Sequence, residues 1–138
     1  MKKNIAVFAS GQGTNFEKIN NYLKINSRNF ECFLFSDNKS CGSVQKSRDL
    51  NIKNIVFNKE ELKNDTVLSL LKKHNIDFII LSGFLSLIPK KIIAAFKNKI
   101  INIHPALLPC FGGKGMFGLN VHKAVVKAKE KKSGITIH

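Results

Sequence analysis

The sequence contains few cysteines, few acidic residues and no long apolar run. Its three cysteines, Cys32, Cys41 and Cys110, form no CxxC pair, which excludes a disulfide framework and a zinc site and favours a reducing compartment, the cytoplasm. No window approaches the length of a transmembrane helix. The apolar run after Lys2 and Lys3 is too short for a signal peptide, because the polar stretch GQGTN interrupts it. We therefore expect a cytoplasmic protein without a membrane partner.

The shortage of acidic residues leaves a strongly basic chain. Lys and Arg number 23 and Asp and Glu 9, so the net charge is +14. Such a charge suits nucleic acid, an anionic membrane surface or a phosphorylated small molecule. The lysines are scattered, however, and no aromatic residues interleave with a dense basic run. We therefore expect no specific nucleic-acid partner and interpret most of the lysines as a solvated surface.

Repeats and linkers are also absent, so the 138 residues predict a single domain. Apolar runs typical of strands alternate with helical patterns, and the run at 76–84 is almost wholly apolar, as in a strand buried on both faces. This alternation predicts an α/β fold with an open, mostly parallel, Rossmann-like sheet and helices on both faces. The expected strands are 4–10, 30–36, 54–58, 76–84, 99–104 and 133–138, and the expected helices are 16–26, 43–51, 66–75, 89–98 and 120–132.

Polar clusters follow four of the expected strands. They are SGQGTN at 10–15, SDN at 36–38, SGFLS at 82–86 and NIHP at 102–105. Right-handed crossovers place the carboxyl ends of parallel strands at one edge of the sheet, where ligands bind in such folds. We therefore expect the four clusters to converge on one binding site.

The glycine-rich loop at 10–15 joins the first strand to the first helix. Its glycines allow a tight turn in which backbone N–H groups approach a ligand, and the N-terminus of the helix favours an anion. Thr14 and Glu17 match a capping box, which would fix the start of the helix, and Thr14 and Asn15 add side-chain donors. The pattern predicts a site for a single phosphate; a glycine turn without a ligand is the alternative.

The same loop lacks the features of the common nucleotide motifs. Phe16 takes the place of the third glycine of GxGxxG, and no GK[ST] follows as in a Walker A loop. Asp37, at the end of the second strand, could bind a ribose. A nucleotide-dependent Rossmann oxidoreductase is therefore a rival interpretation, and the missing glycine argues against it.

An amide and an imidazole share one side of the expected strand at 99–104. Asn102 and His104 alternate along it, and Pro105 ends it. An amide can donate to an oxyanion and a histidine can stabilise it or move a proton, which suits a carbonyl that becomes tetrahedral. The motif holds no serine or cysteine nucleophile, and Cys110 is interpreted as a small apolar residue, so the nucleophile would be a substrate group such as an amine. The alternative is a strand end with a hydrogen-bonded histidine.

Four motifs, in this order, resemble the phosphoribosylglycinamide formyltransferase family over the whole chain. They are ASGQGTN at 9–15, LSGF at 81–84, NIHPALLP at 102–109 and GGKGMFGLNVHKAV at 112–125. The resemblance implies transfer of a formyl group from the cosubstrate 10-formyltetrahydrofolate to the amine of glycinamide ribonucleotide, in purine biosynthesis. The Asn-x-His-Pro pattern also occurs in related amine formyltransferases and in formyltetrahydrofolate deformylases, which are the alternatives.

The resemblance also implies roles for particular residues. Gly13, Thr14 and Asn15 would bind the substrate phosphate, and Asn102 and His104 would be catalytic. No metal is implied, because histidines such as His122 have no second ligand in register. The folate cosubstrate would contact Asn102 and the main chain of Leu85, Ser86, Leu87 and Ile88, a segment in which many relatives carry an arginine in place of Ser86.

The resemblance stops before the family's catalytic aspartate, which lies a few residues beyond the strand at 133–138 and helps to hold a water for proton transfer. A folate-binding loop, a further strand and a helix of the family also follow that point. We therefore expect residues 1–138 to form one formyltransferase-like domain that is incomplete at its C-terminus, whether the end is natural, a frameshift or a cut. The strand at 133–138 would then be an unprotected edge strand of the sheet, which predicts a homo-oligomer. If catalysis is lost, the alternative function is a module that only binds a phosphorylated ligand.

Overall fold

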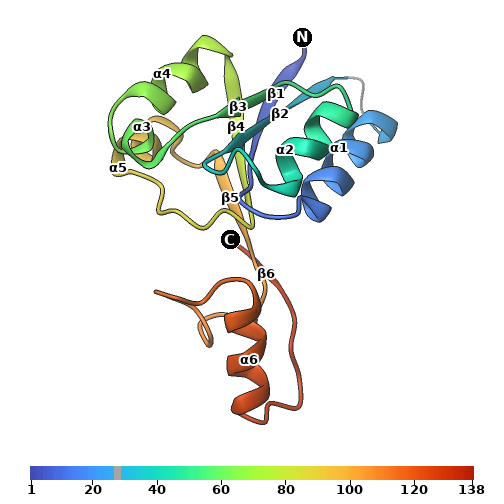
Figure 1. Ribbon diagram of the computed structural model, residues 1–138, viewed down its shortest axis with the longest axis vertical. Coiled ribbons are helices and arrows are strands. Elements are labelled where there is room, and N and C mark those ends of the chain that lie inside the picture. Colours follow the sequence, from blue (N-terminus) through green and yellow to red (C-terminus); the bar gives the residue numbers. More distant parts are fainter. Residues whose placement is uncertain (27–28) are drawn as a thin grey trace.

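The structure is a computed structural model that describes residues 1–26 and 29–138. Strands and helices alternate along the chain, as the apolar pattern predicts (Figure 1). The strands are β1 (Lys3–Phe8), β2 (Phe30–Ser36), β3 (Asn54–Val56), β4 (Ile76–Ser82), β5 (Ile100–His104) and β6 (Thr136–Ile137). The helices are α1 (Thr14–Asn26), α2 (Gly42–Asp49), α3 (Lys59–Lys63), α4 (Thr66–Lys73), α5 (Lys90–Ala95) and α6 (Leu119–Lys127).

The strands form one sheet in the order β3-β2-β1-β4-β5-β6. Neighbouring strands from β3 to β5 pair in parallel, and β6 runs antiparallel to β5. The strand order reverses at β1, which lies between β2 and β4. Ligands bind at such a reversal in open α/β sheets, outside the carboxyl ends of the strands. The expected α/β fold with an open, mostly parallel sheet is confirmed.

Alternate residues of β1 and β2 supply two hydrophobic cores, one on each face of the sheet. On one face, Phe8 and Phe35 stack with ring centroids 5.1 Å apart and belong to a core that includes residues of α3, α4 and α5. On the other face, Val7 and Leu34 pack with Phe16 of α1 and with a residue of α2. Helices therefore cover both faces, as expected. Burial on both faces explains the apolar runs of β1 and β2. The run that forms β4, which we expected to be buried on both faces, is buried only in part, because Phe78 is 40% exposed.

The first helix is held against the sheet by Phe16, whose side chain is fully buried. In the dinucleotide-binding fingerprint, glycine occupies this position so that the helix can approach the strand closely. A phenyl ring fills that space here. The packing therefore agrees with the interpretation that the loop at 10–15 is not a dinucleotide loop.

Two helix starts differ from the sequence interpretation. The backbone N–H of Glu17 donates to the Gly13 carbonyl at 2.9 Å, so Thr14 is already helical. The predicted Thr14–Glu17 capping box is therefore wrong, and the Glu17 carboxylate instead accepts from Lys46 at 2.7 Å. A capping box does occur at α3, which the sequence analysis did not predict, and it joins Asn58 and Glu61.

The last part of the chain extends away from the main body of the sheet, with α6 lying apart from it in Figure 1. Val121 and Val125 of α6 are buried, whereas Leu119 and Val126 are 72% and 75% exposed. The expected strand at 133–138 is shorter in the structure and comprises only Thr136–Ile137. In the part of the chain that the structure describes, no helix has the length and apolar character needed to span a membrane.

Candidate active site

Hydrogen bonds from one serine join the carboxyl ends of β1, β2 and β4. The Ser10 N–H donates to the Gly83 carbonyl at 3.1 Å. The Ser10 hydroxyl donates to Asp37 Oδ1 at 2.6 Å and accepts from the Leu85 N–H at 3.2 Å. Three of the four polar clusters that the sequence places at strand ends therefore meet.

The fourth cluster joins the others through the register of the sheet. Ser82 of β4 pairs with Ile103 of β5, which lies between Asn102 and His104. The two residues of the Asn–His pair are thus on the strand next to the end of β4. The structure brings all four clusters to one edge, as expected from the topology.

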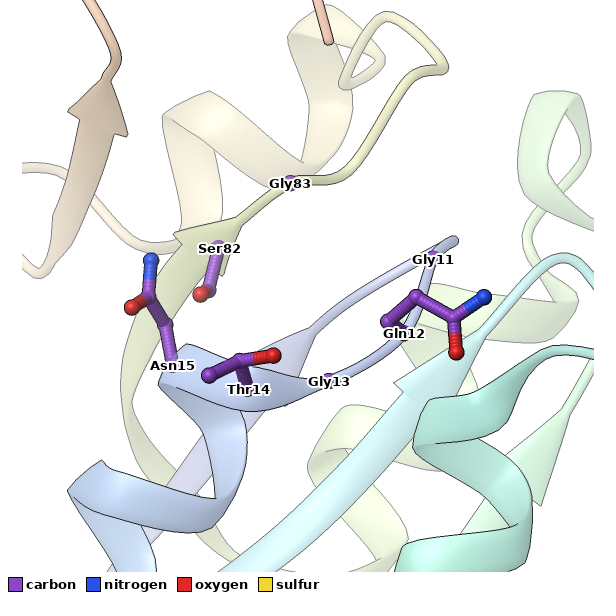
Figure 2. Close-up of a pocket in the computed structure, with 7 residues that line it drawn as sticks. All are labelled: Gly11, Gln12, Gly13, Thr14, Asn15, Ser82 and Gly83. Atoms are coloured by element: carbon purple, nitrogen blue, oxygen red, sulfur yellow. The ribbon is translucent and has the colours of Figure 1, made fainter.

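The loop between β1 and α1 forms a cavity of about 210 Å³ (Figure 2). In Figure 2 the Asn15 side chain points from the first turn of α1 toward the end of β4. Such a volume is below the roughly 300–1,000 Å³ of a site for a drug-sized ligand, and it suits a small group. The cavity is lined by Gly11, Gln12, Gly13, Thr14 and Asn15 from the loop and α1, and by Ser82 and Gly83 from the end of β4.

Gly13 gives the loop its shape. Its φ is +77°, and a Cβ atom at this position would lie 2.7 Å from Ser43 Cα, which is backbone of α2. Ser43 also braces the loop, because its N–H and its hydroxyl both donate to the Gly11 carbonyl, at 3.0 and 2.7 Å. Ser43 was not among the predicted site residues, and its place after the cluster at 36–38 gave no signal for this contact.

The donors around the cavity are uncharged. They are backbone N–H groups and the side chains of Gln12, Thr14, Asn15 and Ser82. The cavity opens at the N-terminus of α1, a helix of 13 residues, where the helix dipole and the free N–H groups favour an anion. The arrangement can therefore hold a small anionic group without a lysine or arginine in the lining.

Asn102 is paired with the end of the chain. Its backbone exchanges two hydrogen bonds with His138, at 2.7 and 3.1 Å, and its side-chain Nδ2 lies 2.9 Å from His138 Nε2. An amide nitrogen only donates, so in this pair the Asn102 Nδ2–H donates to His138 Nε2. The second N–H of the Asn102 amide is then left for another acceptor. His138 was not among the predicted site residues.

His104 is buried, with 9% of the residue exposed. Its Nε2 lies 2.9 Å from the carbonyl oxygen of Phe111, which can only accept, so Nε2 carries a proton. In the neutral ring, Nδ1 is then the atom that can accept a proton. Asn102 and His104 share one side of β5, as expected from their spacing, but each side chain is held by a different segment of the C-terminal part.

The segment from 85 to 88 lies beside the loop at 10–15 and presents apolar groups. Leu85 and Leu87 are 51% and 93% exposed, whereas Ile88 packs against the core. Ser86 is half-buried and donates from its hydroxyl to Asp37 Oδ2 at 2.5 Å. The segment therefore offers exposed leucines and main chain to a ligand, while its serine is held by a carboxylate.

Asp37, which we suggested could bind a ribose, is held by contacts within the chain. Both of its carboxylate oxygens are occupied by hydroxyl donors, Ser10 on Oδ1 and Ser86 on Oδ2. Cys110 was interpreted as a small apolar residue, but the structure places it at the surface, where it is exposed. His122 is exposed on α6, and the described residues contain no group of three His, Cys, Asp or Glu side chains that could hold a metal ion.

Comparison with known proteins decides the family. A family model described as Formyl transferase matches residues 3–138. The chain belongs to the formyl transferase family. The chloroplastic phosphoribosylglycinamide formyltransferase of Arabidopsis thaliana is 42% identical over 144 residues, which cover 99% of this chain and 49% of that protein. The phosphoribosylglycinamide formyltransferase of Bacillus subtilis is 33% identical, with 99% of this chain and 70% of that protein covered.

Solved structures of formyl transferases share the fold. The glycinamide ribonucleotide transformylase 1 of Geobacillus kaustophilus has a TM-score of 0.88 and 31% identity, covering 100% of this chain and 74% of that chain. A formyltetrahydrofolate deformylase of Pseudomonas syringae has a TM-score of 0.83 at 16% identity, which shows the fold alone. The chain spans about half the length of the plant relatives that it matches.

Proposed function

We propose that this chain carries the phosphate site and two catalytic groups of a phosphoribosylglycinamide formyltransferase. The enzyme would move the formyl group of 10-formyltetrahydrofolate to the amine of glycinamide ribonucleotide, in purine biosynthesis. The observation that carries the proposal is the position of the small-anion cavity next to β5. Its lining residue Ser82 pairs with Ile103, between Asn102 and His104.

In this proposal the ribonucleotide phosphate occupies the cavity. Backbone N–H groups of the loop at Gly13 and the side chains of Thr14 and Asn15 would donate to it, and the dipole of α1 would favour its charge. The glycinamide end would then extend along the edge of the sheet toward β5. The net charge of +14 would help to attract both anionic ligands.

The chemical step is a direct transfer between the two substrates. The lone pair of the glycinamide amine attacks the formyl carbon and forms a C–N bond, while the carbonyl oxygen becomes an oxyanion. The free N–H of Asn102 donates to that oxygen, and His104 stabilises it or moves the proton. The bond from carbon to folate N10 then breaks, the amine loses a proton, N10 gains one, and tetrahydrofolate leaves.

The folate would bind along the segment from 85 to 88, with main-chain contacts and the exposed side chains of Leu85 and Leu87 beside its rings. Asn102 would contact it as well, because the formyl group must reach that amide. No metal takes part in the proposed reaction. An arginine contact, which the family resemblance suggests at position 86, is replaced here by a serine that is bonded to Asp37.

Two further parts of the proposal concern location and assembly. The three cysteines are unpaired, which suits a reducing compartment. This would be the cytoplasm or the chloroplast, since the similar plant enzymes are described as chloroplastic. The antiparallel β6 leaves an open sheet edge, and Val126 and Ile137 are exposed. Such surfaces favour a homo-oligomer.

Replacement of Asn102 tests the proposed mechanism. We expect Asn102→Ala to lower turnover roughly 100- to 1000-fold, the typical cost of one lost oxyanion donor. Asn102→Asp should be no better, because a carboxylate repels the developing negative charge. Both variants are made in this chain joined to the C-terminal part of the Bacillus subtilis relative, since the chain covers 70% of that protein.

The measurement is the appearance of tetrahydrofolate under steady-state conditions, with circular dichroism to establish that each variant is folded. A folded Asn102→Ala enzyme within a few-fold of its parent would remove Asn102 from the mechanism.

A further inference from the structure

Three polar side chains form a bridge between the loop at 10–15 and the segment from 85 to 88. Asp37 accepts from the Ser10 hydroxyl at 2.6 Å on one oxygen and from the Ser86 hydroxyl at 2.5 Å on the other. Ser10 is buried, and Asp37 and Ser86 are half-buried. Hydrogen bonds to an ionised carboxylate are short and about twice as strong as those between neutral groups, so this bridge is among the firmest contacts at the edge.

Each member of the bridge follows a different strand. Ser10 follows β1, Asp37 follows β2 and Ser86 follows β4. The segment after β4 is also held at a second point, because the Leu85 N–H donates to the Ser10 hydroxyl at 3.2 Å. A continuous series of hydrogen bonds therefore joins Ser10, beside the cavity, to Leu85 and Ser86.

The cavity and the segment share structural elements as well. Gly83 lines the cavity and its carbonyl accepts from the Ser10 N–H at 3.1 Å. A ligand that orders the loop at 10–15 would restrain Ser10, and through Ser10 and Asp37 it would restrain Leu85 and Ser86. Two ligands that need the same ordered elements bind with positive coupling, since the first one reduces the ordering cost of the second.

We propose that Asp37 is a positioning residue that fixes the segment from 85 to 88 against the phosphate loop and couples the binding of folate to that of the ribonucleotide. The inference rests on the proposed function for the identity of the two ligands. By linkage, the ribonucleotide raises the affinity for folate by the same factor as folate raises the affinity for the ribonucleotide. Asp37 touches neither ligand and acts through the two serines.

The bridge itself is tested first without any ligand, by hydrogen exchange of backbone amides followed by NMR on the 138-residue chain. We expect faster exchange of the Leu85 N–H in Asp37→Asn and in Ser86→Ala, because each change loosens the hold on the segment. The control is Asp49→Asn, which removes a carboxylate that is bonded to Gln45 on α2 and should leave Leu85 unchanged. Unchanged exchange at Leu85 in both bridge variants would overturn the proposal.

The coupling is tested by calorimetry with glycinamide ribonucleotide and 5,10-dideazatetrahydrofolate, each titrated with and without the other. The parent protein is this chain joined to the C-terminal part of the Bacillus subtilis relative. In it we expect each ligand to raise the affinity for the other by about five-fold or more, the usual lower range of coupling. Ser86→Ala should weaken the binding of folate and abolish the coupling. It should not change the affinity for the ribonucleotide measured in the absence of folate. A merely structural defect would instead weaken the binding of both ligands to a similar extent.

The outcomes separate this proposal from the proposed function. Binding of both ligands with coupling intact in Ser86→Ala and Asp37→Asn would overturn the role of Asp37 and leave formyl transfer standing. Binding of neither ligand by the parent protein would contradict the proposed function, and the positioning of the segment by Asp37 would then be decided by the Leu85 exchange alone. A variant that carries both Asp37→Asn and Ser86→Ala should lose no more folate affinity or coupling than Asp37→Asn alone, because both changes break the same bridge.

Discussion

At the scale of single residues, the shape of the loop at 10–15, where we propose that the phosphate binds, depends most on Gly13. A side chain there would need a left-handed φ and would meet the backbone of α2 at Ser43. Gly11 in the same loop is different, because nothing lies within 4 Å of a Cβ atom at that position. The two glycines therefore provide a matched pair of substitutions in one loop.

We expect Gly13→Ala to lower the free energy of unfolding by at least about 1–3 kcal/mol, the usual cost of a left-handed residue other than glycine, with the clash at Ser43 added to it. Gly11→Ala should stay within about 0.5 kcal/mol of the parent, as for a typical surface substitution. Urea unfolding followed by circular dichroism measures both. Equal losses in the two variants would show that the loop does not have the described shape.

Ligand binding is better tested at Asn15, because its change to alanine leaves the turn intact. Asn15→Ala removes a side-chain donor from the cavity lining, so we expect weaker binding of glycinamide ribonucleotide, by about ten-fold for a hydrogen bond of 1.5 kcal/mol to a charged group. Asn21→Ala, an exposed position on the same helix, is the control. Calorimetry that finds equal affinities in the two folded variants would place the phosphate elsewhere.

Some residues of the candidate site were predicted from the sequence and others were not, and the reason is distance along the chain. Gly13, Thr14 and Asn15 are adjacent in sequence, so a local motif was enough to predict that they act together. The contact of Asp37 with Ser86 was not predicted, because the two residues are 49 positions apart. The contact of Asn102 with His138 depends on the antiparallel pairing of β6, which no local pattern indicates.

At the scale of elements, long strands and helices were predictable because they are buried on defined faces. The strand at 30–36 was predicted with the bounds that the structure gives. The helix α3 was missed because its five residues, KEELK, include a single buried residue, Leu62, and show no apolar period. Its capping box with Asn58 and Glu61 was the available signal, at the spacing that such boxes require.

One ion pair joins two elements at the amino end of the sheet, away from the site. The Asp77 carboxylate at the start of β4 accepts from the Asn4 backbone N–H at 2.9 Å and from Lys3 of β1 at 3.1 Å. The hydrogen bond from Asn4, followed by that from Lys3, lowers the pKa of the Asp77 carboxyl below its ordinary value of 3.8. The folded state therefore favours the ionised form, so this contribution to stability is present above pH 3.8 and is lost as the pH falls below it.

We expect Asp77→Asn to lower the midpoint of thermal unfolding near neutral pH and to have little effect well below pH 3.8, where the parent carboxyl also becomes neutral. Asp65→Asn is the control, since the pair of Asp65 with Lys91 is about two-thirds exposed, with side-chain exposures of 65% and 66%, and such pairs contribute little. Thermal unfolding followed across the pH range gives the comparison. A difference between parent and Asp77→Asn that does not shrink in acid would contradict the assignment.

At the scale of the whole molecule, the edge at the amino ends of the parallel strands and the edge at their carboxyl ends have different roles. The amino edge holds the Asp77 contacts, and the carboxyl edge holds the cavity, the Asp37 bridge and the Asn–His pair. The cavity proposed for the phosphate is built from the loop after β1, the start of α1 and the end of β4. Asn102 and His104 are held by the C-terminal part at His138 and Phe111. Phosphate binding should therefore depend less than catalysis on what lies beyond residue 138 in the longer relatives.

The most direct test of the account is a formyl-transfer assay of this chain joined to the C-terminal part of the Bacillus subtilis relative, beside residues 1–138 alone. Tetrahydrofolate is measured with and without glycinamide ribonucleotide. The account predicts that the joined protein releases tetrahydrofolate only when the ribonucleotide is present, one for each formylated amine, and that residues 1–138 alone bind the ribonucleotide but turn over poorly. Release of tetrahydrofolate and formate without the ribonucleotide would indicate a deformylase, and no transfer by the folded joined protein would contradict the central claim.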